Sequence, residues 1–184
     1  MLHAAIVTTD DELLQIHLLN KANHKPNISA QERDTEGFVS WNYPLELLRQ
    51  TQQLAPHVIV KEDDKVVAYA LTLLPEAAAF HTDLKAMFDN LAPVIYNGKP
   101  LAEYKTYCMG QICIDKPWRG KGVFNMLYQH HKLLFAHEFD MVITEISVSN
   151  PRSQKAHEKV GFKTIYSYSD ASDDWNVVAW DWGM

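Results

Sequence analysis

The amino-acid sequence predicts an α/β protein with a mixed sheet. Apolar and β-branched runs of strand length alternate with amphipathic stretches of helix length along most of the chain. The last two strand-like runs follow each other directly, which is typical of a closing hairpin. At 184 residues, of which 47% are hydrophobic and 22% charged, the chain has the size of one domain with a substantial core. We therefore expect a single domain over residues 1–184.

The first part of the chain is expected to contain three strands and two helices. In order, these are a strand at residues 4–8, a helix within 9–23, a short helix starting near Pro44, and a two-stranded hairpin at 57–74. Asp10 is the expected cap of the first helix, because its carboxylate can accept a hydrogen bond from a free N–H of the first turn. The polar residues 24–44 are expected to form a loop, and the acidic turn 62–64 joins the two β-branched runs.

The second part of the chain is expected to continue the alternation. In order, it contains a helix within 76–91, a turn at Asn97 and Gly98, a strand at 104–114, an amphipathic helix at 123–135, a strand at 140–149, a short helix ending at Gly161, and a hairpin of 163–169 with 175–182 around the acidic turn 170–174. Cys108 and Cys113 lie five residues apart in one expected strand, so their side chains should point to opposite faces. They therefore cannot bridge each other, and the sequence supports neither a disulfide nor a metal site.

Charge and composition argue against several classes of function. A net charge of −6 argues against a nucleic-acid partner and is compatible with a cationic substrate. No apolar run approaches the roughly 20 residues needed to span a bilayer. The N-terminal residues lack the basic start, apolar middle and small-residue cleavage site of a signal peptide. We therefore expect a cytoplasmic protein without a membrane partner.

The stretch Arg119-Gly120-Lys121-Gly122-Val123 lies between an expected strand and an expected helix. A helix N-terminus offers unpaired N–H groups and partial positive charge, and Arg119 and Lys121 add full charges. The two glycines let an anion approach the backbone closely, so the stretch predicts a phosphate or pyrophosphate site. Taken alone, it is equally compatible with an ordinary glycine-rich turn. It lacks the patterns of nucleoside-triphosphate and dinucleotide sites.

This stretch resembles the (Gln/Arg)-x-x-Gly-x-(Gly/Ala) loop of the GNAT superfamily of N-acetyltransferases, which holds the pyrophosphate of acetyl-coenzyme A. Phe124 departs from the pattern, since a small residue is usual there. A second segment, from Asn150 to Ser153 and on to Gly161 and Phe162, is similar to the family's other cofactor segment. Taken alone, Gly161 is a helix C-terminal glycine and Phe162 a core residue. Two motifs in the right order, each behind a strand, are more specific than either one.

The resemblance implies a fold and a set of cofactor-binding residues. It implies a GNAT-like, mostly antiparallel central sheet, flanked by helices and splayed between its fourth and fifth strands. Residues 75–103 are an exception, because the family usually has a tight hairpin there. Acetyl-coenzyme A is the implied co-substrate, and no metal is implied. The implied cofactor-binding residues are Ile112, Cys113, Ile114, Arg119, Gly120, Lys121, Gly122, Val123, Phe124, Asn150 and Ser153.

The base that takes the proton of the amine is not fixed by the resemblance. Many relatives carry a glutamate on the fourth strand, but this chain has Gln111 there, and glutamine cannot accept the proton. Glu145 on the neighbouring strand is a candidate base. The alternative is that Glu145 is an ordinary solvated or paired carboxylate.

His157 is the second candidate catalytic residue. It stands four residues before Gly161, where the family often has a tyrosine that protonates the departing thiolate. An imidazolium with an unperturbed pKa of about 6.5 is a stronger acid than a thiol with a pKa of about 8.5, so a protonated histidine can replace the tyrosine. The alternative is that His157 caps or packs the short helix.

These observations predict transfer of an acetyl group from acetyl-coenzyme A to a primary amine of a small molecule or a protein, by direct attack on the thioester. The alternative is a non-catalytic acyl-coenzyme A-binding or regulatory module, which the glutamine at position 111 favours. The resemblance places acceptor recognition around Phe38, Trp41 and Tyr43 and in the turn 170–174. Neither the acceptor nor the oligomeric state follows from the sequence, and a homodimer stays open.

Overall fold

The computed structural model describes residues 1–183, and its strands form a seven-stranded sheet and a separate small hairpin. The strands are β1 (Leu2–Ile6), β2 (Val58–Glu62), β3 (Lys65–Leu73), β4 (Ile95–Tyr96), β5 (Lys99–Pro100), β6 (Thr106–Ile114), β7 (Met141–Ser147), β8 (Lys163–Ser169) and β9 (Asp174–Asp181). The α-helices are α1 (Asp10–Asn23), α2 (Ala30–Glu36), α3 (Leu45–Leu54), α4 (Thr82–Leu91), α5 (Val123–Phe135) and α6 (Pro151–Val160). No helix in this part of the chain is long and apolar enough to cross a membrane.

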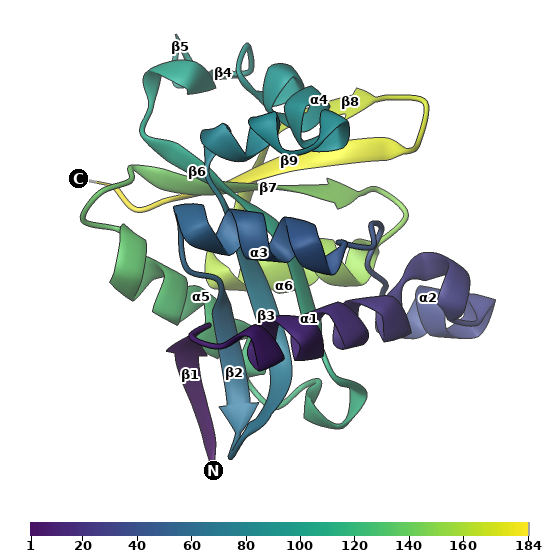
Figure 1. Ribbon diagram of the computed structural model, residues 1–184. Helices are drawn as coiled ribbons and strands as arrows, with labels where there is room; N and C mark the ends of the chain where they lie inside the picture. The colour runs from purple at the N-terminus through teal and green to yellow at the C-terminus, as the bar shows by residue number, and fades with distance from the viewer. Residues whose placement is uncertain (184) are drawn as a thin grey trace.

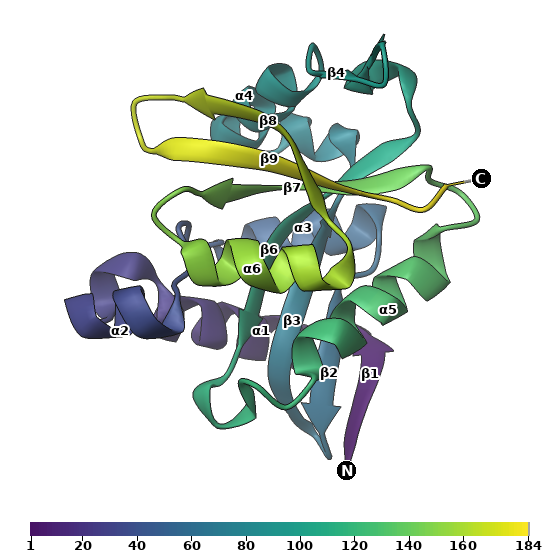
Figure 2. The same ribbon diagram turned by 180° about the vertical axis from the view of Figure 1, so that it is seen from behind.

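The large sheet has the strand order β1-β2-β3-β6-β7-β9-β8. Every neighbouring pair in it is antiparallel except β6 with β7, which is parallel. The helices α1, α3 and α4 cover one face and α5 and α6 the other (Figures 1 and 2). Each face has its own apolar core, with Ile16 and Leu48 buried on the first and Leu127 and Phe162 on the second. The predicted mixed α/β fold is therefore confirmed.

The sheet opens between β6 and β7. These strands pair at only three positions, from Thr106 opposite Met141 to Cys108 opposite Ile143. β6 nevertheless continues to Ile114, and β7 continues to Ser147. The two strands therefore diverge beyond Cys108, which is the splay that the family resemblance implies.

A β-bulge decides which face the side chains of β6 point to. The register between β3 and β6 shifts between Ala70 and Thr72, so β6 has one residue more than β3 over this stretch. The extra residue reverses the alternation of side chains. Cys108 and Cys113 therefore belong to the same apolar core, and the prediction that they face opposite sides is wrong. Both are buried free thiols.

Two helix boundaries differ from the sequence prediction. Residues 24–44 are not one loop, because they contain α2, which begins with Ser29 and Glu32 in a capping box. The cap of α1 is Thr9 rather than Asp10, again through a capping box that uses the glutamate three residues later. In both cases the Ser/Thr-x-x-Glu pattern of the capping box is present in the sequence.

Residues 75–103 form a more broken structure than a single helix. A 3₁₀-helix at Pro75–Ala79 precedes α4, and His81 caps α4 through its ring. The predicted turn at Asn97 and Gly98 joins β4 to β5, and both residues have positive φ. α4 packs through Leu84 and Leu91 on the core it shares with α1 and α3, so the segment adds a wall on that face.

Candidate active site

Two cavities meet at the splay. The first, called here the acidic cavity, has a volume of about 530 Å³, and its charged lining residues are Lys25, Asp83, Glu145, Asp170 and Asp173. The second, called the basic groove, has a volume of about 880 Å³, and its charged lining residues are Glu36, Arg119, Arg152, Lys155 and Lys159. Both are lined by Phe38, Val39, Ile112, Asn150 and Ser153, so they adjoin at the end of β6 and the start of α6.

The glycine-rich loop after β6 lines the basic groove. Gly120 and Gly122 have φ of 74° and 81°, a region that favours glycine. A Cβ built on either residue meets no atom within 4 Å, so each faces open space. Gly122 is the N-cap of α5, and its carbonyl accepts the N–H of Met126 at 3.1 Å. The N–H groups of the first turn therefore have no intrahelical partner and are available to an anion.

All three nitrogens of the Arg119 guanidinium group donate hydrogen bonds within the chain. Nε donates to the carbonyl of Ile114 at 3.0 Å, Nη1 to Glu36 at 2.9 Å and Nη2 to the side chain of Asn23 at 2.6 Å. Its side chain is only 13% exposed. Arg119 therefore joins the end of β6 to α1 and α2 while it lines the groove. Lys121 lies over the ring of Trp118, 4.8 Å from its centre.

The start of α6 is fastened to the segment that follows α2. The Asn150 side chain caps α6 by accepting the N–H of Ser153 at 3.2 Å, and it donates to the carbonyl of Phe38 at 3.1 Å. Arg152 donates to the carbonyl of Thr35 at 2.6 Å and lies 3.6 Å from the carboxylate of Glu36. Since Glu36 also binds Arg119, the segment from α2 to Phe38 bridges the two predicted cofactor segments.

His157 is buried between α5 and α6 and lines the acidic cavity. Its ring packs edge-on against Phe124, 5.0 Å between centres, which accommodates the bulky residue that departs from the family pattern. Nδ1 lies 2.8 Å from the carbonyl of Ser153, so this nitrogen carries the proton and donates. Nε2 is buried and has no hydrogen-bond partner among the described residues.

Burial determines the charge of His157. Burial lowers the pKa of His157 to about 4, so the ring is neutral near pH 7. A neutral ring whose Nδ1–H binds Ser153 offers only a lone pair at Nε2. The imidazolium chemistry that an unperturbed histidine would supply therefore requires the ring to gain a proton first.

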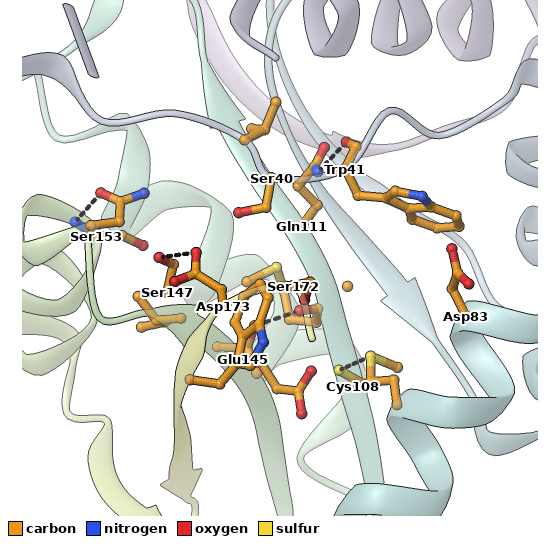
Figure 3. Close-up of a pocket in the computed structure, with 18 of the residues that line it drawn as sticks. Ser40, Trp41, Asp83, Cys108, Gln111, Glu145, Ser147, Ser153, Ser172 and Asp173 are labelled. Atoms are coloured by element: carbon orange, nitrogen blue, oxygen red, sulfur yellow. Dashed lines mark hydrogen bonds between the residues drawn. The ribbon is translucent and has the colours of Figure 1, made fainter. Parts of the chain in front are cut away.

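Glu145 projects from β7 into the acidic cavity (Figure 3). Burial raises the pKa of Glu145 to about 7, and the nearby Asp170 carboxylate raises it further, whereas the hydrogen bond from Tyr168 opposes the rise. The Tyr168 hydroxyl donates to Oε1 of Glu145 at 2.7 Å. A carboxyl group that titrates near neutral pH inside a cavity is suited to take up a proton from a bound substrate.

Gln111 acts as a tether in this structure. Its Oε1 accepts from the hydroxyl of Tyr69 at 2.6 Å and also from Asn20, and its Nε2 donates to the carbonyl of Trp41 at 2.7 Å. Asn20 in turn accepts the N–H of Tyr43 at 2.9 Å. This network holds residues 41–43 against β6, and Trp41 and Tyr43 form part of the cavity wall. Figure 3 shows Trp41 beside Gln111.

The structure brings the predicted site residues together and adds several that the sequence did not indicate. Except for Lys121, which lies over Trp118, the predicted cofactor-binding residues line one or both cavities at the splay. His157 lines the acidic cavity, and Glu145 lies on the strand that leaves the splay. Glu36, Asn20, Tyr69 and Tyr168 join them from distant segments, and no motif marks any of these four. No group of three or more metal-binding side chains occurs among the residues that the structure describes.

Comparison with known proteins identifies the fold. The ribosomal-protein-S18-alanine N-acetyltransferase from Escherichia coli is similar, with a TM-score of 0.62 and 14% identity over 100% of this chain and 96% of the other. An N-acetyltransferase from Staphylococcus aureus gives 0.60 and 19% over 97% and 98% of the two chains. A chain of the NatC complex bound to Gag peptide and CoA gives 0.67 and 11% over 99% of each.

Sequence comparison gives two further results. A search of curated proteins finds no match to this chain. The sequence model of the family described as "Acetyltransferase (GNAT) family" matches residues 27–162, which is more than half of the chain and includes both motifs at the splay. This protein therefore belongs to the acetyltransferase (GNAT) family.

Proposed function

We propose that this protein transfers the acetyl group of acetyl-coenzyme A to a primary amine, and that Glu145 is the base. The observation that carries the proposal is the meeting of two cavities of opposite charge at the splay, with a carboxyl group of raised pKa in one of them. A basic groove suits a phosphate-bearing donor, and an acidic cavity suits an amine. Family membership supports acetyl transfer as the type of reaction.

The residues of the basic groove fit coenzyme A. The glycines at 120 and 122 leave open space beside the free N–H groups of α5, which suits a pyrophosphate. Arg152, Lys155 and Lys159 add positive charge along α6. The edge of β6 beyond Cys108 has no pairing with β7, so its backbone can hydrogen-bond the pantetheine arm near Ile112 and Ile114. Bound acetyl-coenzyme A supplies a thioester, whose carbonyl carbon is open to attack by an amine.

The residues of the acidic cavity handle the amine. An amine attacks only as the free base, and a carboxylate with a pKa of about 7 can accept its proton near neutral pH. Tyr168 holds one oxygen of Glu145, which leaves the other free to receive the proton. We further propose that a backbone N–H near Cys113 or Ile114 stabilises the negative charge that develops on the thioester oxygen.

The role of His157 as an acid stays a prediction. With a pKa of about 4, the ring must gain a proton during the reaction before it can protonate the departing thiolate. If it does so, His157→Phe should lower kcat by about a hundredfold. A variant that keeps the wild-type kcat would show that His157 packs the aromatic cluster with Phe124 and that solvent protonates the thiolate.

A thiol-release assay tests the proposal against the alternative of a non-catalytic module. Purified protein is mixed with acetyl-coenzyme A and each member of an amine panel that includes small amines and peptides with a free N-terminus. We expect steady release of thiol that depends on both the protein and the amine. Saturable binding of acetyl-coenzyme A by calorimetry without thiol release from any amine would instead support the non-catalytic module.

A further inference from the structure

The charges of the acidic cavity are not balanced within the chain. Four carboxylates line it, and Lys25 is the one lysine or arginine among the described lining residues. Lys25 lies 3.8 Å from Asp173 and over the ring of Phe38, 4.9 Å from its centre. Asp83 and Asp170 therefore have no lysine or arginine partner in the cavity. In the view of Figure 3, Asp83 and Asp173 lie on opposite sides of the cavity with Glu145 between them.

The turn between β8 and β9 keeps the carboxylate of Asp170 ionised. The Asp170 carboxylate accepts the N–H and hydroxyl of Ser172 and the N–H of Asp173, and these hydrogen bonds lower the pKa of Asp170 to about 2. Asp173 accepts the hydroxyl of Ser147 at 2.8 Å. The Asp170 carboxylate is therefore held in position and ionised at every pH at which Glu145 titrates, so the cavity keeps a negative group even when Glu145 is protonated.

The uncharged walls suit a short apolar chain. Trp41, Tyr168 and Trp175 present aromatic side chains, which attract cations as well as hydrocarbon. Leu84 and Met87 of α4 close one side, so the segment that replaces the family's tight hairpin gives the cavity an additional wall. The volume of about 530 Å³ lies within the range of small-molecule sites.

A buried nitrogen without a hydrogen-bond partner among the described residues belongs to a residue in the lining of this cavity. The His157 side chain lines this cavity and is 1% exposed, and its Nε2 has no partner among the described residues. Since Nδ1 is the donor to Ser153, Nε2 is a hydrogen-bond acceptor. A buried acceptor without a donor is costly, and an amine or ammonium N–H would satisfy it.

From this cavity we infer that the acceptor is a small amine with a second positive charge, such as an aliphatic diamine; the inference rests on the N-acetyltransferase activity proposed above. One ammonium gives a proton to Glu145, and the free amine attacks the carbonyl carbon of the thioester. The C–S bond breaks, the second proton of the nitrogen goes to the departing coenzyme A thiolate, and the acceptor leaves as a neutral amide. The second nitrogen stays an ammonium throughout and pairs with the carboxylate of Asp170 or of Asp83. An acceptor with a carboxylate at that end would be repelled by the same groups.

Three acceptors that share one alkyl chain test the inference: diaminopentane, pentylamine and aminohexanoate. They present an ammonium, a methyl group and a carboxylate at the end away from the reacting amine. We expect kcat/KM to be at least about tenfold higher for diaminopentane than for pentylamine, and lowest for aminohexanoate. Added salt should reduce the preference for diaminopentane, because it screens the charges. Equal values for diaminopentane and pentylamine would overturn the inference.

Neutral variants identify the groups responsible. Asp83→Asn and Asp170→Asn keep the shape of each side chain, and the amide oxygen at position 170 can still accept the N–H of Ser172. Each should lower the ratio of kcat/KM for diaminopentane to that for pentylamine by about threefold or more. The matched control is Asp89→Asn, since Asp89 lies on α4 but pairs with Lys85 outside the cavity. A ratio that survives in both cavity variants would overturn the inference.

The outcomes separate this inference from the proposed function. Thiol release with a peptide or with aminohexanoate, and none with diaminopentane, would overturn the diamine assignment and leave the N-acetyltransferase activity standing. Binding of acetyl-coenzyme A without thiol release from any member of the panel would overturn both.

Discussion

The basic groove and the acidic cavity adjoin at one opening in the sheet but carry charges of opposite sign on different kinds of groups. The groove relies on backbone N–H groups at the start of α5, supplemented by cations of α6. The cavity relies on side chains, and one of them, Glu145, titrates near neutral pH. Because the two regions use different groups, we expect a substitution in the groove to alter the binding of acetyl-coenzyme A and a substitution in the cavity to alter the reaction of the amine.

The largest expected effect is on the chemical step, through Glu145→Gln. Removing the base should lower kcat by about a hundredfold or more, while the affinity for acetyl-coenzyme A stays within about twofold of wild type. The kinetic assay is paired with calorimetric titration of the cofactor. Glu138→Gln is the control, since Glu138 is exposed and lines neither cavity. An equal fall in cofactor affinity would show that the two regions are not separable.

Thermal melting checks that Glu145→Gln folds, and it has an expected direction. The pKa of Glu145 is raised in the folded protein, so ionising this buried group weakens the fold as the pH rises through about 7. The glutamine variant should therefore melt higher than wild type at pH 8 and lose that advantage at pH 5, where both side chains are neutral. A variant that melts lower at pH 8 would contradict the burial argument.

The next effect concerns the groove, through Gly122→Val. The added side chain points to the open space beside the N–H groups of α5 and also strains a backbone with φ of 81°. Cofactor affinity should fall by about tenfold or more, with kcat at saturating cofactor changed much less. Gly98→Val is the matched control, because Gly98 has the same φ and open surroundings in the β4–β5 turn. Equal losses of affinity in both variants would point to strain rather than to the groove.

A smaller effect is expected from Tyr168→Phe, which removes the hydrogen bond to Glu145. That bond lowers the pKa of Glu145, so its loss should raise the pKa and move the acidic limb of the kcat/KM profile to higher pH. The value of kcat/KM should fall by about threefold at pH 7 and recover at pH 9. Tyr166→Phe is the control, since Tyr166 stacks on Tyr168 and is exposed. An unmoved limb would mean that Tyr168 does not position the base.

The smallest expected effect is a gain, from Glu36→Gln. The Glu36 carboxylate pairs with both Arg119 and Arg152 and so competes with an anion for the groove. Neutralising it should strengthen cofactor binding by about two- to threefold, and by less at high salt. Calorimetry compares this variant with Glu46→Gln, in which an exposed ion pair with Arg49 is lost instead. Weaker binding would show that Glu36 supports the groove and does not compete for it.

The two regions also differ in how far the sequence predicts them. The groove follows from two contiguous motifs, because backbone conformation at Gly122 and capping at Asn150 depend on neighbouring residues. The cavity depends on side chains that converge from segments far apart in the chain. Tyr168 of β8 reaches Glu145 of β7 across the intervening strand β9, and the hydrogen bond between Asn20 and Gln111 spans 91 positions, so no local pattern marks these contacts.

The sequence likewise does not predict the charge of buried groups or the face of the sheet to which every side chain of β6 points. The pKa of His157 depends on the aromatic rings of α5 that bury it, and the motif gives no sign of that burial. The bulge in β6 places Cys113 on the same face of the sheet as Cys108. A prediction from strict alternation of side chains misses this, because it allows for no extra residue. The mixed sheet and the splay can be predicted from the sequence, because the strand and helix patterns are strong and the family resemblance implies their order.

The most direct test of Glu145 as the base is the pH dependence of kcat/KM. It is measured for wild type and Glu145→Gln with the same amine and saturating acetyl-coenzyme A. Wild-type activity should rise through an apparent pKa near 7 that belongs to Glu145, before any contribution from the amine itself at higher pH. The glutamine variant should lack this limb and remain far less active across the range. A variant that keeps both the limb and the wild-type rate would contradict the assignment of Glu145 as the base.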